Sequence, residues 1–112
     1  MNIQIFGAAK CFDTKKAERY FKERNIQYQS IDLHRYGLSK GEFDSVKNAV
    51  GLKELINTNS KAYKTLNMQQ LGTGSVAAEV LFKNPVLYKT PIVRNGKKAT
   101  VGYRPEVWKD WE

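Results

Sequence analysis

Apolar and polar positions divide the chain into a strand–helix–strand start, a helical middle and a second strand region near the end. Residues 1–6 carry apolar side chains at positions 1, 3 and 5, which predicts a strand. The next segment predicts a helix, because its spacing places four residues on one face: Ala17, Tyr20, Phe21 and Arg24. Residues 26–33 alternate again and predict a second strand. Because a strand–helix–strand unit has a right-handed crossover, these two strands are expected to be parallel.

The middle of the chain shows helical spacing and helix-end signals. Ser39 and Glu42 form a capping-box pattern before a helix, and Gly51 is expected to end that helix in the left-handed conformation. Further helical pieces are expected at 52–56, after Ser60, and at 76–81. Asn84-Pro85 then stops the last of them. The pattern predicts a helical insert at about residues 39–83, without strands of its own.

The last segment returns to strand and predicts a hairpin followed by a helix. Asn95-Gly96 is a strong turn signal between two apolar runs within residues 92–101. Pro105 suits the first turn of a closing helix, whose apolar residues are expected to pack on the sheet: Val107, Trp108 and Trp111. The full order is β-α-β, helical insert, β-β-α. This is the thioredoxin-like α/β order, with a mixed sheet and helices on both faces.

Cys11 is the only cysteine, and it lies where the first strand ends and the first helix begins. Asp13 and Thr14 follow it, and both are residue types that cap helices. A thiol at a helix N-terminus lies near unpaired N–H groups and the positive end of the helix dipole, and both favour thiolate. Three nearby cations add to this effect: Lys10, Lys15 and Lys16. The pattern predicts a reactive cysteine, with a buried structural cysteine as the alternative.

Composition limits the classes of function. The length of 112 residues fits one domain, 1–112, and a single cysteine excludes an internal disulfide. The net charge of +8 favours anionic partners, namely small anions, an acidic protein surface or nucleic acid. The cations are scattered and no zinc motif or DNA-binding motif occurs, so neither direct nucleic-acid binding nor a metal site is expected. Without a secretory signal or a membrane-length apolar run, the expected location is the cytoplasm.

Several segments occur in an order that resembles the arsenate reductase (ArsC)/Spx-like family. They are residues 10–17 (KCFDTKKA), 31–33 (IDL), 84–85 (NP), 89–93 (KTPIV) and 102–106 (GYRPE). The resemblance covers essentially the whole length. It implies a thioredoxin-like fold with a helical insert. It also implies a cis Thr90–Pro91 bond that faces Cys11.

The chain departs from the family pattern at positions that bind arsenate. Of the three arginines that surround the cysteine in arsenate-reducing members, only Arg104 is present. Thr90 replaces the one before the cis-proline, and residues 55–59 contain none. Since guanidinium groups bind oxyanions in a bidentate way, we expect little or no arsenate reduction unless Lys89 or Arg94 fills the site.

The resemblance and the residues together lead to a first hypothesis, a single-cysteine thiol oxidoreductase. Cys11 would be the nucleophile, with a small thiol or an anionic compound as substrate. No bound cofactor is expected; an external thiol, glutathione or a glutaredoxin-like protein, would act as reductant. Five residues would bind the substrate: Thr14, Lys15, Thr90, Pro91 and Arg104.

The alternative hypothesis is an Spx-like transcriptional regulator that binds the RNA polymerase α subunit. Gly51 stands near the position where Spx-like members carry a glycine at that contact, although its place at a helix end also explains a glycine. The Cys-x-x-Cys pair of many Spx regulators is absent, because Thr14 occupies the second position. The enzyme requires Cys11, whereas polymerase binding would survive its replacement by serine.

Overall fold

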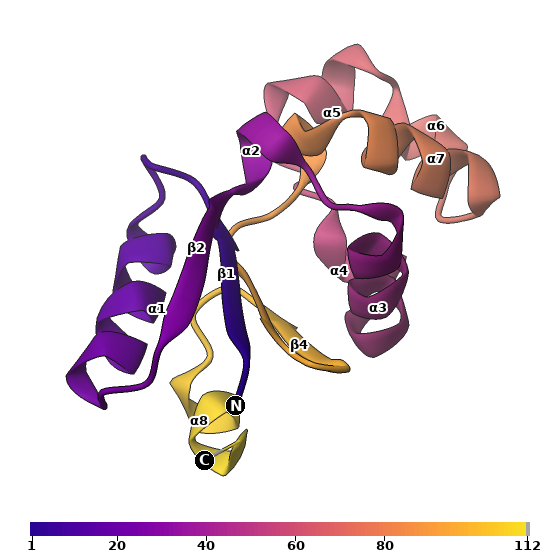
Figure 1. Ribbon diagram of the computed structural model, residues 1–112. Helices are drawn as coiled ribbons and strands as arrows, with labels where there is room; N and C mark the ends of the chain where they lie inside the picture. Colours follow the sequence, from indigo (N-terminus) through magenta and orange to yellow (C-terminus); the bar gives the residue numbers. More distant parts are fainter. Residues whose placement is uncertain (112) are drawn as a thin grey trace.

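A four-stranded mixed sheet forms the centre of the computed structural model, which describes residues 1–111 (Figure 1). The strand order is β2-β1-β3-β4. The central strand β1 (Ile3–Gly7) pairs in parallel with β2 (Tyr28–Asp32) and antiparallel with β3 (Ile92–Asn95). The edge strand β4 (Lys98–Val101) continues the antiparallel pairing. The predicted order of parallel pair and hairpin, and with it the thioredoxin-like fold, is confirmed.

Helices cover both faces of this sheet. On one face lie α1 (Phe12–Glu23) and α8 (Pro105–Trp108), and on the other lies α3 (Lys40–Val50) (Figure 1). The remaining helices are α2 (Leu33–Tyr36), α4 (Leu52–Leu55), α5 (Lys61–Thr65), α6 (Met68–Leu71), α7 (Ser75–Lys83) and two 3-10 turns, η1 (Pro85–Leu87) and η2 (Lys109–Trp111). None of the helices within residues 1–111 is long and apolar enough to cross a membrane.

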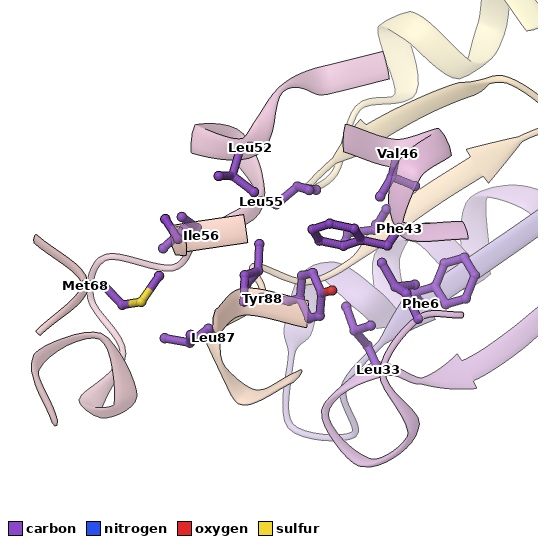
Figure 2. Packing of buried hydrophobic residues seen from close by; sticks show 14 residues of the cluster. Phe6, Leu33, Phe43, Val46, Leu52, Leu55, Ile56, Met68, Leu87 and Tyr88 are labelled. Carbon is purple, nitrogen blue, oxygen red and sulfur yellow. The ribbon is translucent and has the colours of Figure 1, made fainter. Parts of the chain in front are cut away.

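Alternating side chains of β1 divide the interior into two apolar clusters. Ile3 and Ile5 pack with the α1 and α8 residues, including Trp108. Phe6 packs on the opposite face with the helical insert, and Figure 2 shows it beside Phe43. Because successive side chains of a strand point to opposite faces, one short strand supplies both clusters.

Two local signals in the sequence have the predicted structural effect, and a third has it only in part. Ser39 accepts a hydrogen bond from the Glu42 N–H, and the Glu42 carboxylate accepts one from the Ser39 N–H, which completes the capping box. Gly96 has a φ of +62° in the turn between β3 and β4. Gly51 also has a positive φ, +87°, but its ψ of 151° lies outside the left-handed helical region that was expected.

The structure corrects two expectations about elements. The second strand ends at Asp32, and Leu33 begins the unpredicted helix α2. Leu33 is fully buried in the insert-side cluster, so its apolar character reflects tertiary packing rather than strand alternation. Val107 does not pack on the sheet as expected but is exposed, whereas Trp108, the next residue of α8, is fully buried. A helix this short buries a single stripe, and Trp108 occupies it.

Hydrogen bonds tie the insert to the segment that precedes β3. Asn57 donates its backbone N–H to Leu87 O at 2.8 Å, and Lys89 donates to Leu55 O at 2.8 Å. An isolated bridge joins Ile56 to Tyr88 between these two bonds. The insert therefore fixes the chain immediately before Thr90.

Candidate functional site

Cys11 is the N-cap residue of α1, with φ −92° and ψ 116°. Its N–H donates to Ala8 O at 3.1 Å, which closes the turn between β1 and α1. The sequence suggested Asp13 and Thr14 as capping residues. In the structure they lie in the first turn of the helix instead. The thiol itself therefore stands at the cap position, where it faces the unpaired N–H groups of that turn.

Thr14 is buried and organises the turn around the thiol. Its Oγ1 accepts a hydrogen bond from the Ala8 N–H at 3.2 Å. Its side chain also fills the space beside Gly7, where a Cβ would clash with it. The sequence analysis did not identify Gly7 as a site residue. A glycine at the end of a strand could have indicated that another part of the chain packs closely against it.

The Thr90–Pro91 bond is cis and lies beside Cys11, as the family resemblance implies. The Cys11 thiol donates to the Thr90 carbonyl oxygen, with an Sγ–O distance of 3.5 Å. The Gly102 N–H donates to Pro91 O at 2.8 Å, so the chain after β4 also lies next to this segment. Three distant parts of the chain thus meet at the Thr90–Pro91 segment.

The pKa of Cys11 is lowered from its ordinary value. Partial burial raises the pKa, but hydrogen bonds to the thiolate outweigh it: the side chains of Thr14 and Thr90 contribute first, then the backbone N–H groups of Thr14 and Asp13. The Thr90 carbonyl acts in the other direction, because it accepts only from the protonated thiol. The donors prevail, and the site favours the nucleophilic thiolate.

A surface hollow of about 460 Å³ adjoins the turn that carries the thiol. It is lined by residues of the β1–α1 turn, including Ala8 and Thr14, and by the exposed Lys15, together with Glu18 and Asp32. Cys11 itself does not line this hollow, so the binding of substrate by Lys15 stays a prediction. Its charge is partly offset by the two carboxylates.

The two arginines make their contacts with groups other than the thiol. Arg104 donates from Nε to Val101 O at 3.2 Å and lies 4.0 Å from the Glu106 carboxylate. Its binding of substrate therefore stays a prediction. Arg94 points to the insert-side face of the sheet, where it donates to Gln4 at 2.6 Å and to Ser45 at 3.4 Å. Arg94 thus does not replace a missing arginine of the arsenate site.

Comparison with known proteins agrees with this arrangement. The ArsC family profile matches residues 6–111. The chain is 32% identical to the global transcriptional regulator Spx 2 of Oceanobacillus iheyensis over 110 residues, which covers 95% of this chain and 80% of that protein. It is 27% identical to the Listeria innocua regulator Spx, over 93% of this chain and 82% of that one.

A solved structure gives the same result for the fold. An arsenate reductase from Vibrio cholerae superposes with a TM-score of 0.84 at 22% identity, over 98% of this chain and 97% of that one. At this identity the likeness concerns the fold, while the family assignment rests on the profile and on the relative that is 32% identical. The chain belongs to the ArsC family.

Proposed function

We propose that this chain is a single-cysteine thiol oxidoreductase that exchanges disulfides through Cys11. The observation that carries the proposal is the position of a half-buried thiol at the N-cap of α1 and beside Thr90, with hydroxyl and backbone N–H donors around it that lower its pKa. The thiolate, which these donors favour, is the attacking species in thiol–disulfide exchange.

The proposed reaction has two steps, each a thiol–disulfide exchange. The Cys11 thiolate attacks the glutathione sulfur of a mixed disulfide, forms a Cys11–glutathione disulfide and releases the substrate as a thiolate. A second glutathione thiolate then attacks that glutathione sulfur, which forms oxidised glutathione and returns Cys11 to the thiolate. In the net reaction the sulfur of the incoming glutathione is oxidised to a disulfide sulfur, the substrate sulfur is reduced to a thiolate, and the glutathione that was bound to the substrate leaves as half of oxidised glutathione.

The surrounding groups fit these steps. The Thr14 hydroxyl and the N–H groups of the first turn stabilise the sulfur of Cys11 whenever it carries negative charge. Thr90 and Pro91 present backbone groups beside the thiol to an extended, peptide-like thiol. Lys15 is available to an anionic end of the substrate.

Intact-mass analysis after incubation with oxidised glutathione tests the proposal. We expect one glutathione adduct per chain, and we expect reduced glutathione to remove it. Cys11→Ser provides the control and should remain unmodified. A wild-type protein that stays unmodified, or an adduct that reduced glutathione leaves in place, would contradict the proposed reaction.

A second candidate is a regulator that binds the RNA polymerase α subunit, and the 32% identity to Spx 2 favours it. Gly51 is exposed, but its φ of +87° by itself requires glycine there, so the residue does not discriminate between the two functions. Titration calorimetry with the purified α subunit discriminates. Binding that is equal for the wild type and Cys11→Ser would support the regulator; absence of binding would exclude it.

A further inference from the structure

A charged groove runs along α1 on the side that faces the loop after β4. It has a volume of about 380 Å³. Its charged lining consists of Lys16, Arg19, Glu23 and Arg24, and its aromatic lining of Tyr20 and Tyr103. We call it the α1–Tyr103 groove. Cys11 is not among the lining residues.

The charges of the groove favour a dianion. Three cations and one carboxylate give the groove a net charge of two positive units. Lys16 lies 4.0 Å from Asp13, but both side chains are about half exposed, so this ion pair offsets the Lys16 charge only weakly. A phosphomonoester carries close to two negative charges at neutral pH, and guanidinium groups bind phosphate in a bidentate way.

The groove is lined by planar groups, a guanidinium and an aromatic ring, that neighbouring residues hold in place. The Arg24 guanidinium lies 3.7 Å from the Tyr20 ring centroid and donates to Tyr20 O at 3.2 Å, which fixes its plane. Tyr103 is 40% exposed, and its ring packs edge-on against Trp108, with ring centroids 5.6 Å apart. The Lys16 ammonium lies 5.7 Å from the Tyr103 ring centroid. Flat ligands stack on guanidinium planes and on aromatic rings of this kind.

We propose that the α1–Tyr103 groove binds a small phosphomonoester that carries a flat ring, a ligand of the mononucleotide class. Arg19 and Lys16 bind the phosphate, and the Arg24 plane and the Tyr103 ring contact the flat part of the ligand. This site is separate from the thiol chemistry of Cys11 and does not depend on it.

An NMR titration of the full chain tests the proposal with three probes: adenosine monophosphate, adenosine and inorganic phosphate. We expect adenosine monophosphate to shift the amide signals of residues 16–24 and of Tyr103 and Arg104, and to bind about tenfold or more tightly than either fragment. Shifts located elsewhere, or no saturable binding at millimolar concentration, would overturn the site. Equal affinity for inorganic phosphate would overturn the assignment of a ring-bearing ligand.

Charge-matched variants separate the groove from the general positive charge of the protein. Lys16→Gln with Arg19→Gln should lower the affinity about tenfold or more. Arg35→Gln with Lys98→Gln removes the same charge outside the groove and should leave the affinity unchanged. An equal loss in both double variants would overturn the proposal. Cys11→Ser should bind like the wild type, so the thiol reaction and the groove can fail independently.

Discussion

The lowered pKa of Cys11 depends on individual side-chain donors as well as on the helix N-terminus. The largest stabilising hydrogen bond to its thiolate comes from the Thr14 side chain, while the same hydroxyl oxygen accepts from the Ala8 N–H. One buried residue thus organises the β1–α1 turn and lowers the pKa of the thiol. The nearby lysines, which were expected to favour the thiolate, are exposed and screened, and the causes of the lowered pKa are hydrogen bonds.

Replacing Thr14 by valine should raise the pKa of Cys11, because the hydroxyl donor is lost while the volume is kept. The loss of the Ala8 hydrogen bond should also lower the free energy of unfolding by about 1 kcal/mol. The rate of alkylation against pH measures the first effect; the wild-type midpoint should lie below about 8.5. Thr65→Val, on exposed α5, is the matched control. A wild-type midpoint at or above 8.5 would return Cys11 to a structural role.

Arsenate should be a poor substrate, because only Arg104 of three family arginines is present and its contacts are with Val101 and Glu106. Each missing charge-assisted bond removes about 1.5–3 kcal/mol, so two weaken binding by a factor on the order of hundreds or more. A coupled assay with glutathione, glutaredoxin and arsenate measures this. Turnover like that of an authentic arsenate reductase would contradict it.

A pair of substitutions tests whether the scaffold could still bind arsenate. Thr90 lies beside Cys11, and Asn57 is joined by its backbone to Leu87, so both positions border the same segment. Thr90→Arg combined with Asn57→Arg should therefore give a gain of arsenate binding, measured by calorimetry. The wild type and each single variant serve as controls.

At the scale of elements, helix α3 shows how a local signal supports the insert. Ser39→Ala removes the acceptor for the Glu42 N–H and should lower the free energy of unfolding by about 1 kcal/mol. Denaturant unfolding measures it. Ser75→Ala is the control, because the N-cap of α7 is Gly74 and Ser75 is exposed. An equal loss in both variants would mean that the capping box adds nothing particular to α3.

At the scale of the whole molecule, helix α8 closes one face of the sheet through a buried bond. Trp108 is fully buried and donates from Nε1 to Thr100 Oγ1 at 2.8 Å. Thr100→Val leaves this donor without its acceptor and should cost about 1–3 kcal/mol of unfolding free energy. Trp111→Phe, at a half-buried position, should cost less. Calorimetric melting of both variants decides whether the bond or only the packing holds α8.

The sequence by itself determined the features that depend on neighbouring residues. The Ser39–Glu42 box, the Asn95-Gly96 turn and the strand–helix junction at Cys11 rest on hydrogen bonds and dihedral preferences within a few residues. Such interactions can be read from spacing, because the atoms that make them are held close by the chain itself. Together with the order of strands and helices along the chain, they predicted the thioredoxin-like fold.

Only the tertiary structure decided the features that depend on register and packing. Cys11 and Thr90 are 79 positions apart, and their contact exists because β1 and β3 pair and the insert holds the intervening chain. The same pairing turns Arg94 toward α3, and burial places Leu33 in a helix rather than in the strand. The polar or apolar character of a residue does not determine which face of the sheet it lies on or which distant residue it contacts. Both depend on how the sheet and the two helical layers pack together.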